Sequence, residues 1–259
     1  MKWFIERGTI SKLFKDGENI IYPWGFETAD SSAFFSLEEG IGYRHEILEK
    51  SINTTDISFN AQYVVRMKEG LWKLEIEDEI HSSNRISRKA ILTCLEKSCF
   101  MDFVLRFRFR KSFYPIAKIA GKEIPHKNSN IYHQYPVLEA ALPPNLHLRV
   151  VDYCNSKQLS PFMYVRDLND EWIVHARMLP CKWNKEVIKL CNAWAKTKPL
   201  PQMISKPLLA VDPIRNALWY RPERKPFTNK ILKRINPSAI PIATLAKGEI
   251  LNWHVEVMF

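Results

Sequence analysis

Arginines and histidines recur at alternate positions in the second half of the sequence. Guanidinium groups bind carboxylates, phosphates and sulfates through two parallel hydrogen bonds, and an imidazole transfers protons near neutral pH. If the segments that carry them are neighbouring strands, these side chains would line one face of a sheet and would bind an anionic ligand. The residues concerned are Arg106, Arg108, Arg110, His147, Arg149, His175 and Arg177.

A second interpretation of the same pattern involves no ligand. Arginines on the solvated face of a sheet discourage edge-to-edge aggregation, and they form ion pairs with acidic residues on neighbouring strands. In this interpretation the partners come from the acidic first half of the chain. They are Glu75, Glu77, Asp78 and Glu79.

The segment 126–136 is rich in side chains that can move a proton. It contains His133 together with Tyr132 and Tyr135, in a stretch that we expect to be a loop. We predict His133 as a candidate base and either tyrosine as a candidate acid. The histidines of this segment do not have the spacing that is typical of a metal site, so we predict no metal.

A predicted β-hairpin would place an orienting group beside His175. Asn169 and Asp170 favour a turn, and Asp167 and His175 lie on either side of it. A carboxylate that holds a histidine is the general arrangement around an activated base, so we predict that Asp167 orients His175. In the alternative, Asp167 forms a salt bridge with Arg166 at the turn.

Other classes of site are excluded by motifs that the sequence lacks. There are eight glycines and none lies between Gly121 and Gly248, and neither glycine-rich phosphate-binding fingerprint occurs. There is also no serine elbow and no C-x-x-C pair. We therefore predict a site without a cofactor.

Trp24 follows Pro23 in a predicted turn and is our candidate for stacking on a sugar or another flat ligand.

The elements that must position these residues are predicted to be β-strands. Apolar and polar residues alternate in many segments, most clearly in 103–110, where the apolar side chains share one face and the arginines share the other. We count about a dozen such segments at intervals of roughly 10–15 residues, a spacing typical of all-β folds. The pattern predicts a large antiparallel β-sandwich or jelly roll, with one or two short helices.

The clearest helix candidate is the run Lys185–Lys196, which Asn184 would cap, and the alternative is a strand that begins at Val187–Leu190. We predict a single β-rich domain over residues 1–259. A subdivision near 114–120 is the alternative, because residues 1–114 place their turns at glycine and residues 115–259 place theirs at proline.

Charge is unevenly distributed along the chain, whose net charge is +10. Residues 1–98 hold 13 Lys and Arg against 16 Asp and Glu, whereas residues 99–259 hold 25 against 12. A nucleic-acid-binding protein that uses the basic segment 221–234 is therefore one alternative function. A homo-oligomer, in which the acidic part of one copy meets the basic part of the next, is another.

No run approaches the roughly 18 apolar residues of a membrane span, and no secretory signal is evident, so we expect a cytoplasmic protein.

The repeated His-x-Arg spacing favours a small-molecule site over these alternatives. We predict that an anionic or polyhydroxylated ligand, either a saccharide or an acidic metabolite, binds on a cationic sheet face. The reaction that such a site would allow is cofactor-free acid–base turnover of the lyase, isomerase or cyclase type. His175 or His133 would act as the base, and Arg149 and Arg177 would hold the anion.

Overall fold

The computed structural model describes residues 1–30, 33–37, 42, 44–100, 102–126, 132–154, 156–180 and 243–259. Within these ranges the regular structure consists of β-strands without a helix, and every strand pairing is antiparallel. The strands are β1 (Lys2–Glu6), β2 (Thr9–Lys15), β3 (Glu18–Asn19), β4 (Ile21–Ala29), β5 (Phe34–Ser36), β6 (Glu46–Thr54), β7 (Ser58–Met67), β8 (Gly70–Ser82), β9 (Arg85–Cys94), β10 (Ser98–Phe100), β11 (Asp102–Arg110), β12 (Ile116–Ile119), β13 (Lys122–Pro125), β14 (Tyr132–Gln134), β15 (Glu139–Leu142), β16 (Leu146–Tyr153), β17 (Leu159–Leu168), β18 (Glu171–Pro180), β19 (Ala243–Leu245) and β20 (Ile250–Met258).

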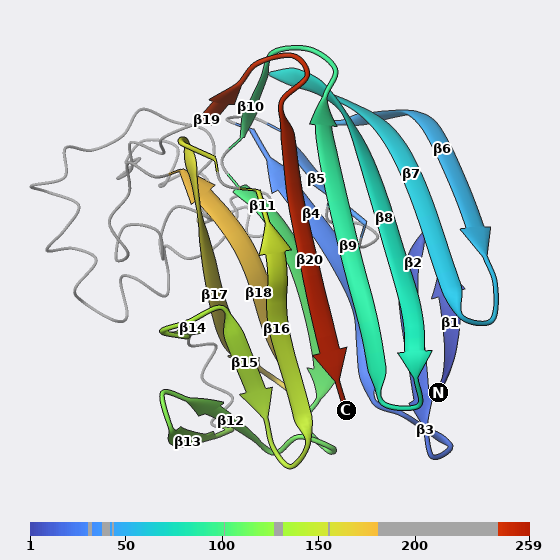
Figure 1. The fold of residues 1–259 in the computed structure, drawn as a ribbon, viewed down its shortest axis with the longest axis vertical. Helices are drawn as coiled ribbons and strands as arrows, with labels where there is room; N and C mark the ends of the chain where they lie inside the picture. Colours follow the sequence, from blue (N-terminus) through green and yellow to red (C-terminus); the bar gives the residue numbers. More distant parts are fainter. Residues whose placement is uncertain are drawn as a thin grey trace, which may run out of the picture.

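Two large sheets form the body of the molecule. The six-stranded sheet has the order β14-β17-β18-β11-β4-β5, and the nine-stranded sheet has the order β13-β12-β15-β16-β20-β9-β8-β7-β6. Figure 1 shows the nine-stranded sheet in front, with β4, β11 and β18 behind it. Buried side chains from both sheets belong to one hydrophobic cluster. The predicted antiparallel β-sandwich is therefore confirmed.

Strand β11 shows how the alternating sequence produces this packing. Phe103, Leu105, Phe107 and Phe109 are completely buried in the cluster between the sheets, as their period of two predicts. The intervening arginines lie on the opposite face of the same sheet. Each fully buried phenylalanine or leucine contributes about 1.5–3 kcal/mol relative to an exposed one, so the apolar side of β11 determines which face turns inward.

Each large sheet contains strands from both halves of the chain, and the two halves meet at one strand pair in each sheet. In the six-stranded sheet β11 lies between β4 and β18, and in the nine-stranded sheet β20 lies between β16 and β9. Strands on either side of residue 114 thus share their hydrogen bonds and their core. The prediction of one domain over residues 1–259 stays a prediction, because the chain between 181 and 242 is outside the described residues.

Two sequence predictions fall on residues that the structure does not describe. These are the helix over 185–196 and the basic segment 221–234, on which the nucleic-acid alternative depends. The assembly alternative also stays a prediction. None of the described residues belongs to a helix long and apolar enough to cross a membrane.

Candidate functional site

Four adjacent strands present polar side chains on the face of the six-stranded sheet that is turned away from the core. His175 of β18 lies directly opposite Tyr164 of β17 on one side and opposite Arg106 of β11 on the other. Opposed residues in an antiparallel pair point to the same face, so these three side chains form a row across the sheet. We call this surface the polar face, and its members are Glu27, Asp102, Arg106, Arg108, Tyr164, Glu171, His175 and Arg177.

Each arginine of the polar face has an acidic partner. Arg106 donates from Nη1 to Oε1 of Glu27 at 2.5 Å. Arg108 holds the carboxylate of Glu171 through two hydrogen bonds of 2.6 and 2.9 Å. Three arginines of this surface are therefore matched by three carboxylates, whereas the alternating arginines and histidines of the sequence predicted a cationic face. Arg110, at the next outward position of β11, donates to the carbonyl oxygen of Ile21.

Arg177 makes two contacts at the centre of the polar face. One guanidinium nitrogen donates to the carboxylate of Asp102, and the other donates to the hydroxyl oxygen of Tyr164. Burial alone would lower the pKa of Arg177, but the charges of Tyr164, Asp102 and Glu27 raise it above the ordinary value. Arg177 is therefore charged at every accessible pH, and it stabilises negative charge on both of its partners.

The polar face is unusually well buried for a set of ionisable groups. Apart from Arg108, whose side chain is 20% exposed, every member keeps less than a tenth of its surface in contact with solvent. Burying charges is costly unless they are paired, and clusters of buried titratable groups concentrate at functional sites. Arg108 is thus the point at which the polar face meets solvent.

The row formed by Tyr164 and His175 has the groups that proton transfer requires. The two ring centroids are 4.9 Å apart in an edge-to-face arrangement. An imidazole accepts or donates a proton near neutral pH, and a phenol hydroxyl can donate one. The arrangement therefore places a phenol, an imidazole and three guanidinium groups on one surface.

The sequence pattern indicated Arg106, Arg108, His175 and Arg177 but not the residues that complete the group. Tyr164 was visible as an alternating position before Arg166, but it carries no motif. Glu27 lies in a strand that is otherwise largely apolar, and Asp102 is the one acidic residue of the arginine-bearing strand β11. An acidic residue in such a strand can be noticed in the sequence. Only the strand register shows that Glu27 and Asp102 meet the arginines.

Two of the predicted ligand-binding residues lie on the other sheet. His147 and Arg149 belong to β16, at exposed positions of the nine-stranded sheet. Arg149 donates to Glu256 of the neighbouring strand at 3.3 Å. The predicted seven-residue face is therefore divided between two sheets, because the same His-x-Arg spacing occurs in strands that are not neighbours.

The acidic residues proposed as structural partners pair elsewhere. Asp78 forms a fully buried ion pair with Arg88, in which both hydrogen bonds measure 2.7 Å. The other three lie beside basic groups of β8 and β9, in the pairs Glu75–Lys73, Glu77–Lys89 and Glu79–His81. The acidic residues of β8 thus pair within their own sheet, and Arg106, Arg108 and Arg177 pair with Glu27, Glu171 and Asp102 respectively.

Asp167 does not orient His175, contrary to our prediction. It lies opposite Trp172 in the β17–β18 register, on the other face of the sheet from His175. Its carboxylate accepts a hydrogen bond from Nζ of Lys111 at 2.6 Å and also contacts His126. Burial lowers the pKa of Lys111, and the contact with Asp167 opposes that shift.

The predicted loop around His133 contains strand β14, which extends the six-stranded sheet. His133 lies opposite Val165, on the side of the sheet that faces the core, and Tyr132 pairs with Arg166. Tyr135 is buried, and burial raises the pKa of its hydroxyl. His133 and Tyr135 therefore do not share the face that carries His175.

Trp24 is a core residue and not a residue of an exposed turn. It is completely buried within β4, and its ring meets Phe107 edge-to-face at 5.0 Å. The guanidinium carbon of Arg88 lies 5.3 Å from the ring centre. The predicted stacking of a sugar on Trp24 is therefore wrong, because no face of the ring reaches the surface.

Comparisons with known proteins add a structural likeness only. No family model matches the sequence, and no curated protein matches it. One similar solved structure is that of a "putative aldose 1-epimerase" from Escherichia coli K12, with 8% sequence identity and a TM-score of 0.49. The alignment covers 97% of this chain and 92% of that one.

Within the described residues, no three His, Cys, Asp or Glu side chains are grouped so that they could hold a metal ion.

Proposed function

We propose that the polar face binds an anionic or polyhydroxylated small ligand, a saccharide or an acidic metabolite, and turns it over by acid–base chemistry without a cofactor. The observation that carries this proposal is the placement of His175 between Tyr164 and Arg106, with Arg177 bound to the Tyr164 hydroxyl. A base, an acid and anion-binding groups on one rigid sheet are the components that such chemistry requires.

Each side chain has a definite role in the proposed reaction. The imidazole of His175 removes a proton from a carbon or a hydroxyl of the ligand, and the Tyr164 hydroxyl gives a proton to a ligand oxygen. Arg177 stabilises the resulting phenolate, while Arg106 and Arg108 bind the ligand's oxygens or its carboxylate. One proton is taken and one is given, so the reaction is an isomerisation, a ring opening or an elimination with no change of redox state.

Binding would exchange one set of ion pairs for another. A ligand carboxylate that enters beside Arg108 would compete with Glu171 for the guanidinium, and in the same way with Glu27 for Arg106. Because both arginines are already held by ion pairs, they lose little conformational entropy on binding. The acidic partners favour polyhydroxylated ligands, whose hydroxyls donate to carboxylates.

The test is turnover of a panel of reducing sugars, sugar acids and hydroxy acids in heavy water, followed by proton NMR. Exchange of a carbon-bound proton, or faster interconversion of anomers, reports acid–base turnover whatever the product is. We expect His175→Gln and Tyr164→Phe to lower the rate by about 100-fold or more, as for the loss of a general acid or base. His147→Gln, on the other sheet, is the matched control. Wild-type binding and turnover in both His175→Gln and Arg177→Lys would overturn the proposal.

A further inference from the structure

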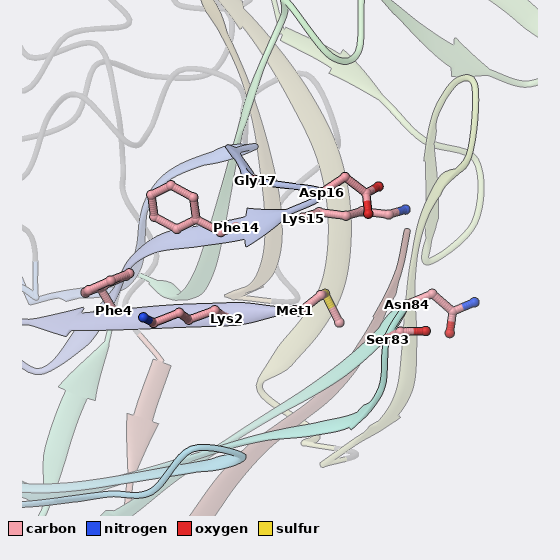
Figure 2. Close-up of a pocket in the computed structure, with 9 residues that line it drawn as sticks. All are labelled: Met1, Lys2, Phe4, Phe14, Lys15, Asp16, Gly17, Ser83 and Asn84. Atoms are coloured by element: carbon pink, nitrogen blue, oxygen red, sulfur yellow. The ribbon is translucent and has the colours of Figure 1, made fainter.

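A separate pocket lies at the small sheet formed by β1, β2 and β3. Its volume is about 590 Å³, which is within the usual range of small-molecule sites. Its wall comes from the β1–β2 hairpin, the turn after β2 and the turn between β8 and β9. The lining residues are Met1, Lys2, Phe4, Phe14, Lys15, Asp16, Gly17, Ser83 and Asn84, and Figure 2 shows them. None of them belongs to the polar face.

One end of this pocket is aromatic. The rings of Phe4 and Phe14 meet edge-to-face, with their centroids 5.6 Å apart and an angle of 67° between their planes. Phe4 is 41% exposed, although its neighbour Trp3 is buried on the other side of the strand. The amine of Lys2 lies 5.2 Å from the centre of the Phe4 ring. A flat ring that enters this corner would contact the face of one phenyl group and the edge of the other.

The other end of the pocket is polar and carries both signs of charge. In Figure 2 the side chains of Lys15, Asp16, Ser83 and Asn84 lie on the side of the pocket away from the two aromatic rings. A lysine amine binds an anion such as phosphate, whereas a carboxylate repels one and accepts hydrogen bonds from hydroxyl groups. A ligand that suits both therefore has a diol and an anionic group in addition to its flat ring.

We propose that this pocket binds a nucleotide. The heteroaromatic base would lie in the corner between Phe4 and Phe14, the ribose hydroxyls would donate to Asp16, and the phosphate would bind Lys15. A phenyl ring accepts any base, so the pocket discriminates little between purines and pyrimidines. A base, a ribose and a phosphate are found both in a free nucleotide and in one nucleotide of a single-stranded nucleic acid, so either could be the ligand.

Isothermal titration with the whole chain, carrying any tag at its C-terminus, tests this proposal. The ligands are adenosine and uridine monophosphates, adenosine without a phosphate, ribose 5-phosphate without a base, and a short single-stranded oligonucleotide. We expect both monophosphates to bind, and both partial ligands to bind more weakly. Tighter binding of the oligonucleotide than of the monophosphates would identify a nucleic acid as the source, and the reverse would identify a free nucleotide.

Two substitutions separate stacking from general attraction to a basic protein. Phe4→Leu keeps an apolar side chain at a partly exposed position but removes the ring, and we expect it to weaken binding by about five- to a hundred-fold. Lys15→Gln should weaken binding of the monophosphates but not of adenosine. Lys89→Gln, on the nine-stranded sheet and outside the pocket, is the control for lost positive charge. Equal affinity of the wild type and Phe4→Leu, or equal affinity for ribose 5-phosphate and the nucleotides, would overturn the proposal.

Discussion

Arg177 and Asp102 form a buried ion pair although 75 positions separate them in the sequence. In the register of β18 with β11, Arg177 lies opposite Val104, so Asp102 is its diagonal neighbour on the same face of the sheet. The same guanidinium reaches Tyr164 on the next strand. One arginine thus connects an acidic residue of β11 to the hydroxyl of the proposed catalytic acid.

Removing the charge of Asp102 should destabilise the protein strongly. Asp102→Asn leaves the guanidinium of Arg177 buried without its counter-charge, and breaking one partner of a buried pair typically costs about 3–5 kcal/mol. Urea unfolding followed by tryptophan fluorescence measures the loss. Glu77→Gln, which removes one partner of an exposed pair with Lys89, should leave the urea midpoint almost unchanged. Similar midpoints for the two variants would contradict this account.

The buried pair of Arg88 and Asp78 should behave differently when both partners are replaced. Burial raises the pKa of Asp78, although the charge and hydrogen bonds of Arg88 oppose that shift. The ion pair therefore stabilises the folded state little more than two apolar side chains of similar volume would. Each of Arg88→Met and Asp78→Leu alone should cost about 3–5 kcal/mol, because it leaves a charge in the core. The double variant should recover most of that loss in urea unfolding. A double variant no more stable than the worse single variant would show that the ion pair itself stabilises the core.

Two buried tyrosines should make the protein sensitive to alkali. Burial raises the pKa of both Tyr63 and Tyr114 to about 12 from 10.0. A raised pKa in the folded state means that each tyrosine contributes stability below about pH 10, and that this contribution is lost as the pH rises through about 12. The loss should be at most about 2–3 kcal/mol for each tyrosine.

Urea unfolding between pH 8 and pH 11.5 measures this dependence, and Tyr63→Phe isolates one tyrosine. The Tyr63 hydroxyl makes one long hydrogen bond, 3.3 Å, to the carbonyl oxygen of Gly8, so its removal should cost little at pH 8. Above pH 10 the variant should lose stability less steeply than the wild type. Parallel pH profiles of the two proteins would exclude Tyr63 as a source of the effect.

Alternation in the sequence predicted which way the side chains of β11 point, but not which strands are neighbours. The alternation in β11 placed its arginines on one face correctly. The same reasoning assigned His147 and Arg149 to that face, although β16 belongs to the other sheet. Pairing between strands distant in sequence depends on the packing of the whole core, and period-two alternation carries no information about it.

The error at Trp24 has a local physical cause. Pro23 and Gly25 on either side of it are typical of a turn, but here they lie inside β4. The register of β4 with β11 shifts by one residue between Arg106 and Arg108, at the point where Pro23 and Trp24 stand. A proline inside a sheet is tolerated at such a bulge, because its missing N–H falls where the ladder is already interrupted. Pro23 and Gly25 therefore mark a β-bulge inside β4 and not a turn between strands.

The two faces of the β17–β18 hairpin should be energetically independent. His175 lies opposite Tyr164, whereas Asp167 lies three residues further along β17, about 10 Å away, and on the other face. In double-mutant cycles of unfolding, His175→Gln and Tyr164→Phe should show a coupling energy of about 0.5 kcal/mol or more, because their rings are in contact. His175→Gln and Asp167→Asn should be additive to within about 0.5 kcal/mol, since the two side chains lie on opposite faces of the sheet.

The same variants extend this test to turnover. Because Asp167 holds Lys111 and contacts His126 on the other face, Asp167→Asn should lower stability without changing the pH dependence of any turnover that requires His175. Tyr164→Phe should instead change that pH profile while Arg177 keeps its contact with Asp102. A pH profile that shifts with Asp167→Asn and not with Tyr164→Phe would return the orienting role to Asp167, and would place the acid–base chemistry on the core side of the sheet.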